Sequence, residues 1–90
     1  MHLVYIIQSL KDHSWYYGYS TDIKRRLEYH NQGKSSYTSK KSPWVLIFQR
    51  PFEDKSEALK FERYLKKTRN KTYIFQAFSE FFIRDVAQLG

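Results

Sequence analysis

The chain has 90 residues, which is enough for one domain with a small core. Aromatic residues make up 19% of it, so we expect large rings to supply most of the buried contact area. A formal net charge of +7 favours a polyanionic partner, although a basic surface without a specific partner would have the same charge. The absence of cysteine excludes disulfides, thiolate nucleophiles and cysteine metal sites.

The first predicted element is a strand over Leu3–Ile7, because this run is β-branched and aromatic. The run is apolar on both faces, as expected for a covered central strand. It is too short for a signal peptide or a membrane span, so we expect a cytoplasmic protein without membrane contact. A polar connector, Ser9–Ser14, leads to a second strand over Trp15–Tyr19, and the two strands are compatible with an antiparallel hairpin.

The second strand places its aromatic residues on opposite faces. Strand alternation puts Tyr16 and Gly18 on one face, and Trp15, Tyr17 and Tyr19 on the other. Gly18 is unusual inside a strand, where glycine indicates a bulge or the close approach of another group to the backbone. We expect Tyr17 to belong to the core.

A helix is predicted next, from the cap candidates Ser20–Asp22 to about Gln32. Gly33 is positioned to end it, since glycine is common just after the last helical turn. Ile23 and Leu27 are its apolar anchors. The position of the polar residues relative to these anchors is therefore informative.

Two basic residues of this helix border the apolar stripe. At about 100° per residue from Ile23, Arg26 lies at about −60° and His30 at about −20°. Arg25 falls at about 200°, on the opposite side. Arg26 and His30 are thus placed for packing, for ion pairing or for chemistry, whereas Arg25 should face solvent.

The segment 33–42 is predicted to be a loop. Its lysines, Lys34, Lys40 and Lys41, and its several hydroxyl side chains suit contact with phosphate oxygens. A mobile loop without a ligand would have the same composition. We favour the phosphate contact because the net charge points the same way.

A third strand is expected over Trp44–Gln49, between Pro43 and Pro51, because proline fits the ends of strands and not their interiors. The run is apolar almost throughout, which indicates cover on both faces. The segment Asp54–Glu57 then has the form of a variant capping box. It predicts a helix that runs to about Thr68.

Glu62 is the most informative position of this helix. Measured from Ala58, Phe61 lies at about −60°, Leu65 at about −20° and Glu62 at about 40°, inside the apolar arc. A carboxylate there is expensive to bury unless a cation, a metal ion or several donors meet it. The alternatives are a side chain that bends out to solvent and an ion pair with Arg26.

A basic cluster over 66–71 ends this helix. Cations are favoured there by the helix dipole alone, but they also extend the positive surface. The nucleic-acid-binding candidates in the cluster are Lys66, Lys67, Arg69 and Asn70. A last helix is predicted over Thr72–Ile83, and Arg84–Gly90 should fray. We therefore expect one domain, 1–83, followed by a short tail.

The order strand, strand, helix, strand, helix, helix predicts an α/β (α+β) domain with a small three-stranded antiparallel sheet flanked by helices. From about residue 2 to about residue 75, the chain resembles the GIY-YIG nuclease domain, and in particular its small stand-alone bacterial (YhbQ-like) members. Val4-Tyr5-Ile6 represents the first half-motif, without the leading glycine, and Tyr16-Tyr17-Gly18 represents the second. Arg26, His30 and Glu62 fall on the family's remaining motif positions.

The resemblance implies a role for each of these residues. Glu62 would hold one Mg²⁺ or Mn²⁺ ion, and water molecules would complete the coordination of that ion. Arg26 would bind the scissile phosphate, and His30 would assist in proton transfer or phosphate binding. Tyr5 would be the general base, a role that requires a lowered pKa of its phenol. Tyr16 would orient the water or the phosphate. The two tyrosines could exchange these roles.

These roles imply a metal-dependent endonuclease that hydrolyses DNA phosphodiester bonds. Its substrate would be branched, nicked or otherwise structured DNA, in repair or recombination, at the nucleoid of a bacterial cytoplasm. Gly18 would let the DNA come close to the backbone. One alternative is a catalytically inactive nucleic-acid-binding module of the same fold. Another is a basic interaction protein, in which Tyr5, Tyr16, Arg26 and Glu62 would be scattered in space.

Overall fold

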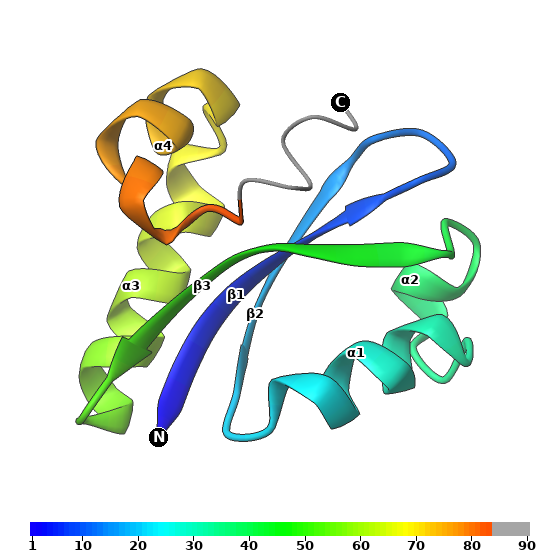
Figure 1. Cartoon of the computed structure of the whole chain (residues 1–90), viewed down its shortest axis with the longest axis horizontal. Helices are drawn as coiled ribbons and strands as arrows, with labels where there is room; N and C mark the ends of the chain where they lie inside the picture. The colour runs from blue at the N-terminus through cyan, green and yellow to red at the C-terminus, as the bar shows by residue number, and fades with distance from the viewer. Residues whose placement is uncertain (84–90) are drawn as a thin grey trace.

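Residues 1–83 form a three-stranded sheet with helices on both of its faces in the computed structural model, which describes this part of the chain (Figure 1). The elements are, in chain order, β1 (His2–Ser9), β2 (Trp15–Ser20), α1 (Ile23–Asn31), α2 (Ser36–Ser39), β3 (Trp44–Phe52), α3 (Lys55–Thr68), α4 (Lys71–Ala77) and the 3₁₀ turn η1 (Ser79–Phe81). The predicted class and the predicted antiparallel sheet are confirmed. The predicted tail, 84–90, lies outside the described residues.

β1 is the central strand of the sheet, whose order is β2-β1-β3. Val4, Tyr5, Ile6 and Ile7 are all buried, as predicted for a strand covered on both faces. β2 pairs with one edge of β1 in a register that sets Tyr5 opposite Gly18. β3 pairs with the other edge, so β2 keeps one edge free within the described sheet.

The larger core lies on the face covered by α3 and α4 (Figure 1). Val4 and Ile6 of β1 pack there with Ala58 and Leu65 of α3 and Ile74 of α4, and all five side chains are buried. The apolar arc predicted for the second long helix is therefore confirmed, and it lies against the sheet.

The smaller core lies on the opposite face, which α1 covers (Figure 1). Tyr5, Ile7 and Trp44 are buried there, and the partly buried Ile23 and Leu27 of α1 pack against them. Adjacent residues of β1 thus serve different cores, because successive strand side chains point to opposite faces.

The strand β2 divides its aromatic residues between the two cores as predicted. Tyr16 packs on the α1 side of the sheet. Trp15, Tyr17 and Tyr19 pack on the α3 side, where they are partly buried. Tyr17 is therefore part of the larger core, and Tyr16 is free to take part in the site on the other face.

Side-chain caps fix the beginnings of the two longer helices. The backbone N–H of Arg25 donates to the Asp22 carboxylate at the start of α1 (3.2 Å). The N–H of Ser56 donates to the Asp54 carboxylate at the start of α3 (2.9 Å). Gly33 follows α1 with a φ of +75°, the left-handed conformation that favours glycine. These helix ends agree with the sequence analysis.

Two predicted boundaries are wrong in the middle of the chain. The segment 33–42 is not a plain loop, because it contains the short helix α2, which carries the buried Thr38. The third strand does not end before Pro51 but continues to Phe52. Proline is tolerated there because β3 lies at an edge of the sheet, where its missing N–H breaks no ladder bond on the open side.

The predicted last helix, Thr72–Ile83, is also too long. α4 ends at Ala77, and the chain then turns through η1. Phe82 pairs with Phe48 in an isolated bridge, and the N–H of Ile83 donates to the carbonyl of Ile47 (2.9 Å). Hydrogen bonds to β3 therefore replace the last helical turns. Within residues 1–83, no helix is long and apolar enough to cross a membrane.

Candidate active site

Tyr5 lies at the centre of the smaller core and reaches across the neighbouring strand. It is 1% exposed and pairs in register with Gly18 of β2. A Cβ atom added at Gly18 would overlap the phenol ring of Tyr5, at its Cζ, Oη and Cε1 atoms. Gly18 is thus the close approach that the sequence predicts, but the approaching group is Tyr5 and not DNA. Its predicted contact with nucleic acid is wrong, because Gly18 is buried.

His30 holds the hydroxyl of Tyr5 from the last turn of α1. Tyr5 Oη and His30 Nε2 share a hydrogen bond of 2.9 Å, and His30 Nδ1 shares another, also 2.9 Å, with Thr38 Oγ1. The carbonyl of Thr38 in turn accepts from the indole N–H of Trp44 (2.9 Å). His30 is 1% exposed, so both ring nitrogens are occupied inside the protein. In this arrangement His30 therefore cannot bind a phosphate directly, but it can exchange a proton with Tyr5.

Arg26 of α1 lies beside this network, where its side chain acts on Tyr5. Its guanidinium stacks over the ring of Tyr29, 4.7 Å from the ring centroid. The Arg26 charge lowers the pKa of His30, after burial, and it opposes the raised pKa values of Tyr5 and Tyr16. Arg26 is exposed and does not enter the core, but its charge acts on the buried groups as the helix wheel predicts.

Glu62 approaches the same groups from α3. Its side chain is 15% exposed and forms a loose ion pair with Lys66, one turn further along the helix (3.7 Å). The Glu62 carboxylate raises the pKa of both Tyr5 and Tyr16. Glu62 is therefore partly buried, and its charge acts on both tyrosines.

The two tyrosines differ from the expected reactive form. Burial, more than any other cause, raises the pKa of Tyr5 to about 12, and the charges of Tyr16 and Glu62 add to the increase, while Arg26 counteracts it. Burial also raises the pKa of Tyr16, with Glu62 adding to it. The lowered tyrosine pKa expected from the sequence is therefore wrong for this structure. Tyr5 is firmly protonated near neutral pH.

Tyr16 completes the cluster at the free edge of the sheet. Its ring packs edge-on against His30, with centroids 4.9 Å apart, and against Trp44, at 6.4 Å. The structure thus brings Tyr5, Tyr16, His30 and their charged neighbours into one place. The interpretation of the chain as a basic protein with scattered polar residues is incompatible with this arrangement.

A metal ion at this cluster would have one protein carboxylate to bind. Within residues 1–83, no group of three or more His, Cys, Asp or Glu side chains is arranged to hold a metal ion. His30 already uses both ring nitrogens. Glu62, whose ion pair with Lys66 is long, fits a hard divalent ion that takes its other oxygen ligands from water and phosphate.

Comparison with known proteins identifies the family. The GIY-YIG catalytic domain matches residues 1–74, a range that includes both tyrosines, Arg26, His30 and Glu62. This chain belongs to the GIY-YIG family. The match agrees with the geometry, because every residue that the resemblance selected lies in or against the cluster.

Small bacterial UPF0213 proteins are similar to this chain over most of their length. The UPF0213 protein YazA of Bacillus subtilis is 42% identical over 76 residues, which are 82% of this chain and 76% of that protein. The UPF0213 protein SH2523 of Staphylococcus haemolyticus is 44% identical over 66 residues, 72% of this chain and 79% of the relative. The solution NMR structure of the UPF0213 protein BH0048 from Bacillus halodurans matches with a TM-score of 0.55 and 38% identity, over 86% of this chain and 84% of that one.

The predicted nucleic-acid-binding residues of this GIY-YIG domain occupy different surroundings. Lys34 lines a shallow hollow of ≈ 530 Å³ that it shares with Arg25 and Arg26. Lys40 is exposed, and Lys41 forms an ion pair with Asp12 (3.5 Å). Lys34 therefore lies beside the cluster, whereas Lys41 already has an acidic partner.

The cations at the end of α3 have a second, separate hollow. Lys66 and Arg69 line it, and Lys67 is exposed outside it. Asn70 is the N-cap of α4, where its side-chain carbonyl accepts from the N–H of Tyr73 (3.0 Å). Asn70 therefore caps a helix, as asparagine often does, and its nucleic-acid role stays a prediction.

Sequence reasoning missed two residues of the GIY-YIG site. Thr38 fixes His30, but it lies in a polar segment without a helical or strand period, so no pattern distinguishes it. Tyr29 supports Arg26, and its position three residues further along the same helix is a signal that could have revealed the contact.

Replacement of Gly18 by alanine should destabilise the protein through Tyr5. The added methyl group overlaps the buried phenol ring, and overpacking of this kind costs about 1–3 kcal/mol. Urea denaturation of Gly18→Ala should show this loss, and the same substitution in a Tyr5→Leu background should cost much less. An equal cost in both backgrounds would contradict the proposed contact.

The buried imidazole should make stability depend on pH. Burial, aided by Arg26, lowers the pKa of His30 below 6.5, so the unfolded chain takes up this proton first as the pH falls. The free energy of unfolding should therefore fall as the pH drops through about 6.5, and should level off below the folded-state pKa of His30. Denaturation curves of His30→Gln should lose this component, whereas the exposed-site variant His13→Asn should keep it. An unchanged pH dependence in His30→Gln would contradict the assignment.

Proposed function

We propose that the protein is a metal-dependent endonuclease that hydrolyses DNA phosphodiester bonds. The observation that carries the proposal is the Tyr5–His30 hydrogen bond, which lies beside an exposed Arg26 and a partly buried Glu62. Phosphodiester hydrolysis needs a base for the attacking water, a cation for the phosphate and stabilisation of the leaving oxygen. The cluster offers one candidate side chain for each requirement.

Arg26 is placed to bind the scissile phosphate. It is exposed, and its ring contact with Tyr29 limits the positions that the guanidinium can take. The hollow in front of it is lined by Arg25 and Lys34 as well. A planar guanidinium donates two parallel hydrogen bonds to phosphate oxygens, which a lysine cannot do.

Tyr5 and His30 provide a path for the proton of the attacking water. A Tyr5 pKa of about 12 makes a free phenolate unfavourable, so Tyr5 must lose its proton as it gains one. As the water oxygen bonds to phosphorus, the water proton passes to Tyr5 Oη and the phenol proton passes to His30 Nε2. The lowered pKa of His30 keeps the ring neutral near pH 7, which is the form that accepts a proton.

Thr38 is compatible with this path, because its hydroxyl can accept from His30. With His30 Nδ1–H donating to Thr38 Oγ1, Nε2 is the free acceptor that the Tyr5 hydroxyl needs. The bond from phosphorus to the leaving oxygen breaks, and that oxygen takes a proton from solvent. Tyr16 packs on the imidazole at the open edge of the sheet, where it is placed to orient the water or the phosphate.

Glu62 would hold the divalent cation, Mg²⁺ or Mn²⁺. Such an ion, when bound, supplies charge neutralisation at the phosphate and stabilises the leaving oxygen. The partial burial of Glu62 beside the two phenols supports this role, because an ionised carboxylate in such surroundings needs a cationic partner.

The substrate we propose is DNA that is branched, nicked or otherwise structured, cut during repair or recombination in the cytoplasm. A net charge of +7 and the three cations of the hollow at the end of α3, whose described lining residues include no acidic one, support a polyanionic substrate. One observation favours an inactive binding module instead, namely the high pKa of Tyr5. The cleavage experiments below separate the two functions.

Replacement of Glu62 should abolish metal-dependent cleavage and leave DNA binding largely intact. We expect no cleavage of nicked or branched DNA by Glu62→Gln in Mn²⁺, because its neutral amide is a poor ligand for a hard cation. Gel assays of cleavage and of binding measure the two properties separately. Glu57→Gln, on the exposed side of α3, is the matched control and should cleave normally. Undiminished cleavage by Glu62→Gln would refute the assignment, and an inactive wild-type protein that binds DNA would establish the inactive module.

Adjacent arginines of α1 should differ in their effect on cleavage. Arg26→Ala should lower the cleavage rate by roughly a hundredfold or more, the usual cost of removing one donor to a developing negative charge. Arg25→Ala removes the same charge without the contacts to the cluster, and should cost only a small factor. Single-turnover cleavage kinetics compare the two variants, and equal losses would show that only the net charge matters.

A further inference from the structure

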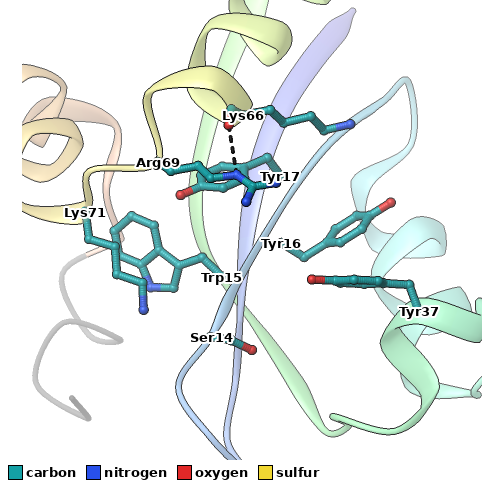
Figure 2. A pocket seen from close by; sticks show the side chains of 8 residues that line it. All are labelled: Ser14, Trp15, Tyr16, Tyr17, Tyr37, Lys66, Arg69 and Lys71. Atoms are coloured by element: carbon teal, nitrogen blue, oxygen red, sulfur yellow. Dashed lines mark hydrogen bonds between the residues drawn. The ribbon is translucent and has the colours of Figure 1, made fainter.

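A cavity of ≈ 360 Å³ opens at the free edge of β2, and of the groups assigned to hydrolysis only Tyr16 lines it (Figure 2). The start of β2 forms its floor, and α2 and the end of α3 form its walls. Its volume is within the range of small-ligand sites, about 300–1,000 Å³.

Four aromatic side chains line this cavity. Tyr16 and Tyr37 lie together, with ring centroids 5.7 Å apart, and Trp15 and Tyr17 lie nearer to α3 (Figure 2). Tyr37 is 62% exposed, although it is a large ring on a short helix. An exposed aromatic ring at the mouth of a cavity is suited to stacking with the face of a ligand.

Three cations line the same cavity, and none of the described residues that line it is acidic. Arg69 adopts a left-handed conformation after α3, with a φ of +52°, and its Nε donates to the carbonyl of Lys66 (3.1 Å; Figure 2). Lys71 Nζ lies 5.3 Å from the ring centroid of Trp15 and donates to the carbonyl of His13 (3.0 Å). Backbone contacts thus hold two of the cations in place beside the aromatic rings.

The cavity is continuous with the proposed catalytic cluster. Tyr16 belongs to both, since one side of its ring packs on His30 and the residue also lines the cavity. Lys66 lines the cavity and forms the ion pair with Glu62. A DNA strand whose phosphate meets Arg26 and Glu62 would therefore place a neighbouring nucleotide at this cavity.

We propose that the cavity binds an unpaired nucleotide of the DNA substrate, next to the scissile phosphate. Its base stacks on the aromatic side chains, and its phosphates meet Lys66, Arg69 and Lys71. A base inside a duplex has both faces covered by its neighbours, so only an unpaired base has a face to offer to Tyr37. This inference rests on the proposed function and specifies its substrate as DNA with an unpaired nucleotide beside the cleavage site.

Binding of a fluorescent base tests the proposal without cleavage. The full chain is titrated, in EDTA, into a duplex with one unpaired 2-aminopurine and into the same duplex with that base paired. We expect the unpaired form to bind at least fivefold more tightly, with quenched 2-aminopurine fluorescence, since base–aromatic stacking contributes about 1 kcal/mol or more. Equal affinities, or an unpaired base whose fluorescence does not change, would overturn the proposal.

Tyr37→Ala should remove most of this preference, because Tyr37 is the most exposed ring of the cavity. Tyr73→Ala is the matched control, as Tyr73 is also an exposed tyrosine, 45%, and lies on α4 outside the cavity. Melting temperatures verify that both variants fold. A preference that survives Tyr37→Ala, or is lost equally in both variants, would overturn the stacking role.

The role of the cavity cations is tested in the same assay by substitution of two residues at the end of α3. Arg69→Asn, which tolerates the left-handed conformation, should weaken binding of the unpaired duplex more than Lys67→Gln, which removes an equal charge outside the cavity. Equal losses of affinity would show that Arg69 contributes only its charge and no specific contact in the cavity, which would overturn the proposal. Cleavage without any preference for the unpaired base would refute the cavity alone, whereas this preference without cleavage would refute the proposed nuclease and leave the cavity.

Discussion

The buried hydroxyl of Tyr5 is the constraint on which the rest of the site depends. A phenol that is 1% exposed must have a hydrogen-bond partner, and His30 provides it. His30 is itself buried, so its second nitrogen needs Thr38, and the carbonyl of Thr38 needs Trp44. Hydrogen bonds thereby link one polar atom on β1 to α1, α2 and the start of β3. Among the described residues, no buried side-chain nitrogen or oxygen lacks a partner.

This arrangement gives the same side chains a structural and a chemical task, and the two tasks conflict. Burial holds Tyr5 in one position, but it also raises the pKa to about 12, which opposes its use as a base. In the proposed mechanism the hydrogen bond to His30 would resolve the conflict, since a phenol that passes its proton along as it accepts another never has to exist as a free phenolate.

Much of the fold and the cluster follows from periodicity. The helical period placed His30 and Glu62 on apolar faces, and strand alternation separated Tyr16 from Tyr17. The role of Thr38 was not predicted because its segment is polar and has no helical or strand period, although its side chain is completely buried. The direction of the Tyr5 pKa shift was wrong because burial depends on how α1 closes over the sheet, which no local pattern expresses.

The position of β2 explains why such a buried network is still accessible to a polymer. β2 is an edge strand, and the ring of Tyr16 on it packs against both His30 of the cluster and Tyr37 of the cavity. Gly18 lets Tyr5 extend from the central strand across β2 towards this edge, which a side chain at position 18 would prevent. The cavity shares Tyr16 with the cluster, and the other hollow contains Arg26 and Tyr29. The DNA strand proposed above would have to contact both hollows, which favours a flexible strand over a rigid duplex as the substrate.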